Sequence, residues 1–361
     1  MSNSMWPVVL ASVENFVLMN GALSALAFII GATLRSISRA RAWHPLTSSR
    51  LYATALIVPP LFSAWLVIAS LLPATWLGVE RWLTEHQAAH TLHLLNAFTV
   101  PVDPVLGYAA LAFTLTASVL AVYGAASAYF RIGRIIRRLE VGAEPVAPEL
   151  IRQVEEACRR YGIDVGLVVS RYPFSFVWGY LRSKLVVSTG LLNALSSAEL
   201  SGLLEHEAAH HSRRDNLSKW ALTVCQYASP VFPLTRLLYR WWNEQVEMVC
   251  DEVAARRTSS AVEVAGALVR MKRLSPATMP GRVQSCESGF FGEGGENFED
   301  RVLRILSLDE QPGVKEAISL SRSWARPAVL IGSVFALTLV TLFVVSPLAI
   351  HRLVEVLLHA F

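Results

Sequence analysis

Charged residues are scarce in this chain of 361 residues, because only 17% are Asp, Glu, Lys or Arg, against about 25% in a typical soluble domain. This deficit excludes a disordered protein, an ordinary nucleic-acid-binding module and most soluble enzymes. Cysteine is also scarce. The four cysteines form no C-x-x-C pair, which excludes a disulfide framework and a cysteine-based zinc site. The net charge of +4 does not separate nucleic acid from anionic lipid as a partner.

The chain contains long apolar runs. Four runs of 19 to 27 residues contain no Asp, Glu, Lys or Arg, at about positions 16–34, 51–76, 104–130 and 327–350. Because about 20 apolar residues cross a bilayer, the sequence predicts four transmembrane helices. The N-terminus has no basic region and no clear cleavage site, so we expect the first helix to be retained rather than removed as a signal peptide.

Arginines are concentrated at one end of each predicted span. They lie between the first two spans, directly after the third and just before the fourth, at Arg35, Arg39, Arg41, Arg50, Arg131, Arg134, Arg137, Arg138, Arg322 and Arg326. Cytoplasmic loops collect Lys and Arg, so we expect the N-terminus outside and residues 131–326 in the cytoplasm. All the cysteines then lie on the reducing side, in agreement with this topology. Arginines beside a span favour lipid headgroups over nucleic acid as their partner.

The predicted cytoplasmic segment, residues 131–326, is long enough for one globular domain. Short β-branched runs at 165–170 and 184–188 predict two strands. Gly179 and Tyr180 lie between these runs and are typical of a turn. The segment is therefore expected to combine helices with a small sheet.

Three further signals divide the rest of this segment. Ser196 and Glu199 have the spacing of a helix capping box, so a helix is expected to begin there. Residues 217–234 are apolar but interrupted, and they predict a helix packed in the core or against the membrane surface; the interruptions are Lys219, Gln226, Pro230 and Pro233. The Gly-rich run at 289–296 (GFFGEGGE) is typical of a flexible loop.

The helix expected after Ser196 contains the sequence His206-Glu207-Ala208-Ala209-His210. Residues four apart lie one turn apart on the same face, so both imidazoles can reach a single Zn²⁺. Glu207 then lies beside the metal, where its carboxylate can accept a proton from water and return it to a leaving amine. The pattern predicts a catalytic zinc site.

A catalytic zinc site needs a third protein ligand, and a second acidic helix offers one. We predict that Glu247 is this ligand and that Asp251, one turn further on, orients a ligating imidazole. Glu244, on a neighbouring turn, is the alternative ligand. A solvated acidic face that pairs with Arg256 and Arg257 is the structural alternative, which the H-E-x-x-H motif upstream disfavours.

Several other side chains near these motifs have open or minor roles. His211, Arg213 and Tyr239 are equally placed candidates to stabilise the oxyanion of the tetrahedral intermediate. Cys250 has no dedicated base and is predicted to be a small buried apolar residue rather than a nucleophile. Three histidines between the second and third spans are predicted to be interfacial rather than to sense a metal, namely His86, His90 and His93.

Together these motifs resemble the membrane metallopeptidase family of the BlaR/MecR antirepressors. The resemblance covers about residues 25–350 and includes the order of three spans, a cytoplasmic zinc domain and a fourth span. Its most specific motifs are H-E-x-x-H and E-x-x-C-D. The matching runs are His206-Glu207-Ala208-Ala209-His210, Arg213-Arg214-Asp215-Asn216, Glu247-x-x-Cys250-Asp251, Val186-Val187-Ser188 and Asn297-x-x-x-Arg301-Val302-Leu303-Arg304-Ile305.

The resemblance implies a mainly α membrane protein with four transmembrane helices and a cytoplasmic α+β gluzincin-type zinc metalloprotease domain. It implies that His206, His210 and Glu247 hold zinc, with Glu207 as the base and Asp251 supporting a ligand. The strand around Val186 would pair with an extended substrate. The expected parts are a membrane region at 1–130, the protease domain at 131–326, the fourth helix at 327–350 and a short outside tail at 351–361.

The predicted function is a zinc endopeptidase of the bacterial inner membrane, and the resemblance implies that it acts in signal transduction by cleaving a transcriptional repressor or its own chain. The expected partners are a protein substrate and the lipid bilayer, with no direct contact to nucleic acid and with an oligomer allowed. The antibiotic-sensing members of the family carry a penicillin-binding domain after the fourth span. Only residues 351–361 follow that span here, so β-lactam sensing is not expected.

Two other functions stay open at this point. HtpX and the CAAX prenyl proteases share H-E-x-x-H and E-x-x-x-D, which Glu247 and Asp251 also satisfy, and such a protein would act in membrane protein quality control. A non-catalytic membrane receptor that retains zinc for folding is the second alternative.

Overall fold

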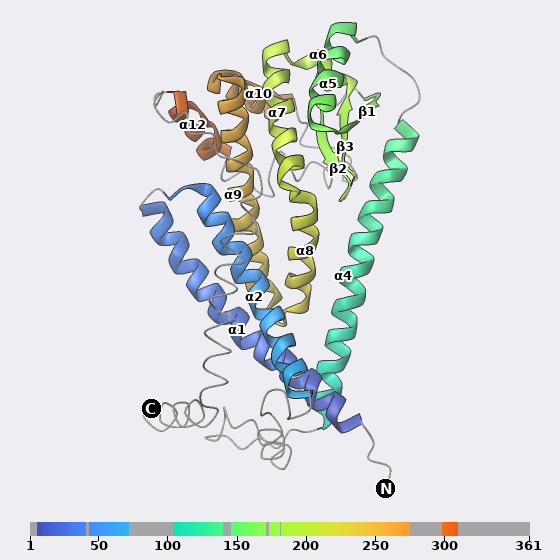
Figure 1. Cartoon of the computed structure of the whole chain (residues 1–361), viewed down its shortest axis with the longest axis vertical. Coiled ribbons are helices and arrows are strands. Elements are labelled where there is room, and N and C mark those ends of the chain that lie inside the picture. The colour runs from blue at the N-terminus through green and yellow to red at the C-terminus, as the bar shows by residue number, and fades with distance from the viewer. Residues whose placement is uncertain are drawn as a thin grey trace.

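The computed structural model is mainly helical with one small sheet, as the sequence predicts (Figure 1). It describes residues 6–40, 43–71, 104–139, 146–170, 173–180, 182–274 and 298–309. The helices are α1 (Trp6–Ala40), α2 (Pro45–Leu71), α4 (Pro104–Leu139), α5 (Pro148–Tyr161), α6 (Thr189–Ala194), α7 (Ser197–Arg213), α8 (Asp215–Ala228), α9 (Phe232–Thr258), α10 (Ala261–Leu274) and α12 (Phe298–Asp309). The strands are β1 (Asp164–Val168), β2 (Ser175–Trp178) and β3 (Lys184–Ser188).

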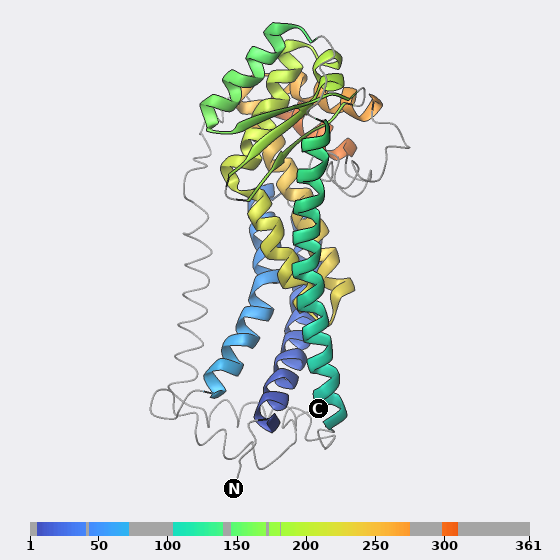
Figure 2. The ribbon, with the colours of Figure 1, turned by 90° about the vertical axis from the view of Figure 1, so that its right-hand side faces the viewer.

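Three long helices, α1, α2 and α4, extend to the end of the molecule opposite the sheet, and the other end of α4 lies beside β1 (Figures 1 and 2). Within the described ranges, one helical segment is long and apolar enough to cross a membrane, namely Phe16–Ser38, with 23 residues and a mean hydropathy of 1.9. It overlaps the first predicted span. A shorter apolar segment, Tyr108–Gly124, lies inside the third predicted span.

The described residues include only part of the other predicted spans. Helix α2 contains the second predicted span as far as Leu71 and includes Pro59 and Pro60 within the helix. The end of that span and the fourth span lie outside the described residues, as do the loop at 289–296, the tail at 351–361 and the three histidines His86, His90 and His93.

The long helices expose large apolar side chains along their length. Ile29 on α1, Leu61 on α2 and Val122 on α4 are each more than 60% exposed. Many exposed large apolar side chains on one set of helices are typical of a surface that meets lipid or another apolar partner.

Residues 217–234 form most of α8 and the start of α9, and the two helices make a hairpin beside the long helices (Figure 1). The side-chain amide of Asn20 on α1 donates a hydrogen bond of 2.8 Å to the carbonyl oxygen of Ala228 at the end of α8. Gly31 on α1 faces Leu238 on α9 so closely that a Cβ atom at Gly31 would lie 2.5 Å from the Leu238 side chain. The segment is helical and packed as predicted, but it is divided between two helices, α8 and α9, and its partners are the long helices.

The sheet has the order β1-β3-β2, with β1 parallel and β2 antiparallel to the central β3. The predicted strands at 165–170 and 184–188 are confirmed as β1 and β3, and Gly179 forms the expected turn with a positive φ of 106°. Strand β2 has no counterpart in the sequence prediction. Because β1 and β2 occupy both edges of β3, the expectation that the strand around Val186 pairs with substrate is wrong.

Helix α7 packs between the sheet on one side and helices α9 and α10 on the other (Figure 1). Its start is the predicted capping box, since the Ser196 side chain accepts a hydrogen bond from the Glu199 N–H and the Glu199 carboxylate accepts one from the Ser196 N–H. Leu200, Leu203 and Leu204 then bury one face in the core. The run from Glu205 to His210 is also buried, so the H-E-x-x-H turn lies inside the protein.

Candidate metal centre

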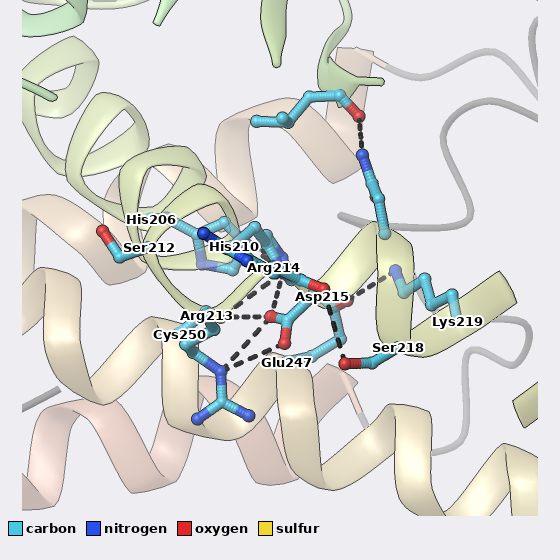
Figure 3. A network of polar contacts seen from close by, with 12 residues as sticks. His206, His210, Ser212, Arg213, Arg214, Asp215, Ser218, Lys219, Glu247 and Cys250 are labelled. Atoms are coloured by element: carbon cyan, nitrogen blue, oxygen red, sulfur yellow. Dashed lines mark hydrogen bonds and ion pairs between the residues drawn. The ribbon is translucent and has the colours of Figure 1, made fainter. Parts of the chain in front are cut away.

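His206 and His210 lie together on consecutive turns of α7 (Figure 3). Their Nε2 atoms are 3.2 Å apart, and the two residues are 1% and 7% exposed. Two nitrogen ligands at about 2.0–2.1 Å from a tetrahedral ion lie about 3.3–3.4 Å from each other. The helix therefore holds the two imidazoles at the spacing that one metal ion requires.

Helix α9 brings Glu247 to the same point. One of its carboxylate oxygens, Oε2, lies 3.6 Å from Nε2 of His206 and 3.6 Å from Nε2 of His210. Neither oxygen of this buried carboxylate has a hydrogen-bond partner among the described residues. Burial alone would raise the pKa of Glu247, but the two histidines lower it well below its usual value and keep the group ionised.

The nearest cationic side-chain atoms, Nη2 of Arg301 at 3.7 Å and Nζ of Lys219 at 3.8 Å, lie beyond hydrogen-bond distance of the buried Glu247 carboxylate, so a closer cation would stabilise it further. Two imidazole nitrogens and one carboxylate oxygen are also the ligand set of many catalytic zinc sites. The three side chains lie close enough together to hold one ion. The residues present therefore fit zinc.

The other acidic side chains of α9 have different partners. Glu244, the alternative third ligand, pairs with Arg35 of α1 at 3.0 Å. Glu252 pairs with Arg256 on the next turn at 2.9 Å. The structure thus brings Glu247, rather than Glu244, to the two histidines.

Asp251 lies against the far side of His206, as the sequence predicts. Its Oδ1 atom is 3.0 Å from Nδ1 of His206. Arg301 of α12 holds the same carboxylate with two hydrogen bonds of 2.7 and 2.9 Å. Burial raises the pKa of Asp251, but Arg301 and His206 outweigh that effect and lower it below its usual value. An ionised Asp251 can accept the Nδ1–H proton and leave Nε2 of His206 for a metal.

Glu207 receives a hydrogen bond from a residue that the sequence prediction does not include. The Oγ atom of Ser175 on β2 donates to Oε1 of Glu207 at 2.7 Å, and Glu207 is 3% exposed. In the sequence, Ser175 lies in the short run Phe174–Trp178, which is too brief for its pattern to distinguish a strand from a helix. Ser175 limits the directions in which this carboxylate can point.

The three candidates for oxyanion stabilisation have other partners. His211 hydrogen-bonds the backbone of Tyr161, and burial lowers the pKa of its imidazole. The Nε atom of Arg213 donates to Oδ1 of Asp215 at 3.2 Å. The ring of Tyr239 packs against that of Trp242, with 5.5 Å between their centroids. Their predicted role stays a prediction.

Two residues of α8 to which the sequence prediction gave no role in the site join the network around the candidate metal centre (Figure 3). Asp215 lies 2.8 Å from Nδ1 of His210, and Nζ of Lys219 lies 3.8 Å from Oε1 of Glu247. Asp215 belongs to the run Arg213-Arg214-Asp215-Asn216, so its position five residues after His210 was the available signal. Cys250 is buried as predicted, with its Sγ atom 3.4 Å from Nδ1 of His210.

Comparison with known proteins agrees with this geometry. Residues 96–264 match the BlaR1 peptidase M56 family. The matched segment contains α7, α8 and α9 and hence every residue of the candidate metal centre except Arg301. The resemblance to the BlaR/MecR family is confirmed over this part of the chain.

Curated relatives carry the name of a second protease group. The chain is 36% identical over 80 residues to a protease HtpX homolog of Ralstonia nicotianae, which covers 21% of this chain and 28% of the relative. It is 32% identical over 97 residues to protease HtpX homolog 2 of Methanosarcina mazei, covering 26% and 32%. The chain thus spans less than a third of the length of these relatives. No solved structure matches it.

Proposed function

We propose that this chain is a zinc-dependent endopeptidase of the bacterial inner membrane. The observation that carries the proposal is the 3.2 Å spacing of the His206 and His210 Nε2 atoms, with the Glu247 carboxylate, which accepts no hydrogen bond from the described residues, 3.6 Å from both. Glu207 on the same helix supplies the base that hydrolysis needs. The peptidase family match and the protease names of the relatives support the same activity.

The proposed chemistry divides among a few side chains. His206, His210 and Glu247 would hold zinc, which when bound polarises a carbonyl and makes a nearby water a stronger nucleophile. Glu207, oriented by Ser175, accepts a proton from the attacking water. The same carboxylate then returns the proton to the amine that leaves as the peptide bond breaks.

Strand β2 is the proposed platform for the substrate. Among the described strands, β2 pairs only with β3. The hydrogen bond from Ser188 N–H to Phe174 C=O shows that the backbone groups of Phe174, and of every second residue after it, face β3. That alternation turns the backbone groups of Ser175 and Val177 toward the outer edge. An extended peptide added at this edge would run beside Glu207, which Ser175 contacts. The side-chain amide of Asn216 already donates a hydrogen bond of 2.7 Å to the carbonyl oxygen of Val177. This bond would limit how far along β2 a substrate strand could pair.

The proposed topology places the N-terminus outside and the protease domain, residues 131–326, in the cytoplasm. The apolar segment Phe16–Ser38 and the exposed apolar faces of α1, α2 and α4 support a membrane anchor. The arginines at one end of the predicted spans support the orientation.

The first proposed role is regulated proteolysis of a transcriptional repressor or of the chain itself, which the BlaR1 family match favours. The second is membrane protein quality control, which the HtpX-named relatives favour. Quantitative proteomics of cells that carry the wild type or the inactive Glu207→Gln variant separates the two. One stabilised DNA-binding regulator supports the first role, and many stabilised membrane proteins support the second.

Zinc titration of the purified full-length protein tests the activity itself. We expect one zinc per chain, with cleavage of unfolded casein lost after chelation and restored by zinc. Glu247→Gln should bind zinc at least tenfold more weakly, because it removes the charged ligand. Glu244→Gln is the matched control and should keep wild-type affinity, because Glu244 pairs with Arg35. Cleavage that persists without metal would contradict the proposal.

A further inference from the structure

The second histidine of the metal centre has a buried carboxylate behind it. Oδ2 of Asp215 lies 2.8 Å from Nδ1 of His210, and Asp215 is fully buried. Nδ1 is the ring nitrogen opposite to Nε2, which faces His206 and Glu247. The contact therefore concerns the side of the imidazole that faces away from His206 and Glu247.

Asp215 is itself held in place by a cation. The Nε atom of Arg213 donates to both carboxylate oxygens of Asp215, at 3.2 and 3.3 Å. A carboxylate that receives hydrogen bonds from a guanidinium on one side and faces an imidazole nitrogen on the other is placed to accept the hydrogen bond of that imidazole.

The same arrangement occurs at the first histidine. There Asp251 lies 3.0 Å from Nδ1 of His206 and is held by two hydrogen bonds from Arg301. The two carboxylates come from different helices, Asp251 from α9 and Asp215 from α8. Each histidine therefore has its own carboxylate and each carboxylate its own arginine.

We infer that Asp215 is a positioning residue for His210. By accepting the Nδ1–H proton, it fixes the tautomer in which Nε2 carries the lone pair, and it fixes the orientation of the ring. The Cys250 sulfur also lies 3.4 Å from Nδ1, but the carboxylate is closer and charged and is the stronger acceptor. The inference deepens the proposed zinc site and rests on it.

This arrangement also connects the metal centre to the long helices. Asp215 begins α8, which packs against α2 and α4. Leu222 of α8 is buried in one cluster with Tyr52 and Leu56 of α2. The packing of α8 against α2 and α4 thus determines the position of the Asp215 carboxylate, which orients His210.

Zinc affinity of the full-length protein in detergent tests this role without any measurement of cleavage. Zinc is titrated in competition with a chromophoric chelator for the wild type and for Asp215→Asn. We expect 10- to 100-fold weaker binding in the variant, the usual effect of losing a carboxylate behind a ligating histidine. Asp251→Asn should give a loss of the same size. Asp300→Asn, at an exposed position on α12, is the control and should bind as the wild type does.

The absorption spectrum of the cobalt-substituted protein provides a second measurement, because its visible bands report the geometry of the ligands. We expect these bands to change in Asp215→Asn and to be largely restored in Asp215→Glu, which keeps the charge. A variant that is less stable but has wild-type zinc affinity and cobalt spectrum would overturn the inference, since Asp215 would then be only structural. A wild type that binds no zinc would instead overturn the proposed function.

Discussion

The Oγ atom of Ser175 donates a hydrogen bond of 2.7 Å to Oε1 of Glu207, joining strand β2 to the helix that carries the H-E-x-x-H motif. A hydrogen bond to a charged group contributes about 1.5–3 kcal/mol. Ser175→Ala should therefore lower kcat about tenfold through a less well oriented base, while zinc affinity stays unchanged. Steady-state cleavage of a fluorogenic peptide, with zinc content measured on the same sample, checks this.

Ser212→Ala is the matched control for that substitution. Ser212 is on the same helix as Glu207, but its hydroxyl donates to the backbone carbonyl of Ala208 at 2.7 Å. Its variant should keep the wild-type kcat. Equal kcat values for Ser175→Ala and Ser212→Ala would show that the contact with Glu207 has no part in the reaction.

The packing of α1 on α9 predicts a sharp difference between two glycines. A Cβ atom at Gly31 would lie 2.5 Å from the buried Leu238 side chain, whereas one at Gly124 on α4 would meet nothing within 4 Å. Gly31→Ala should cost about 1–3 kcal/mol in the free energy of unfolding in detergent, the usual range for overpacking. Gly124→Ala should be neutral or slightly stabilising, since alanine favours the helix.

The double variant Gly31→Ala with Leu238→Ala tests whether the two side chains meet. Truncation of Leu238 makes room for the new methyl group. The double variant should therefore lose less unfolding free energy than the two single variants lose together. Strict additivity would mean that α1 and α9 do not pack as described.

The junction of α2, α9 and α12 predicts a pH dependence of stability. Burial raises the pKa of Glu252, but His44, Arg256 and Arg304 outweigh it and lower the pKa to about 2. A lowered pKa means that the stabilisation is complete above the unfolded-state pKa, about 4.3, and is lost as the pH falls toward 2. Glu252→Gln should remove on the order of 2 kcal/mol at neutral pH, after allowance for solvent screening of the arginines.

Denaturation of the wild type and of Glu252→Gln between pH 2 and 7 measures this effect. The difference in unfolding free energy should shrink steadily below about pH 4.3 and vanish near pH 2. Glu155→Gln, at an exposed position on α5, should follow the wild type throughout. A difference that stays constant over the whole range would contradict an ion pair at Glu252.

The sequence predicts the helices that carry the proposed ligands well because their signals are local. The capping box at Ser196 starts α7, and the spacing of His206 and His210 by four residues alone sets them on one face. Glu247 and Asp251 follow the same rule on α9. The pattern of an amphipathic helix is repeated over several turns, so the prediction of the helix does not depend on any single residue.

The supporting residues could not be predicted in the same way, because their contacts join distant parts of the chain. Ser175 meets Glu207 across 32 positions and Arg301 meets Asp251 across 50. Such contacts depend on how the elements pack, and β2 is too short to give a clear strand pattern. The family resemblance implied that the strand around Val186 pairs with substrate, but β2, which the sequence did not predict, occupies that edge of β3.

The claim that this site is a zinc peptidase with Glu207 as its base is tested most directly by zinc content and cleavage rate in Glu207→Gln. The substitution keeps the size of the side chain and removes the ability to accept a proton. We predict that the variant retains one zinc per chain and that cleavage of casein falls at least a thousandfold. Cleavage by the zinc-loaded variant at the wild-type rate would contradict the account.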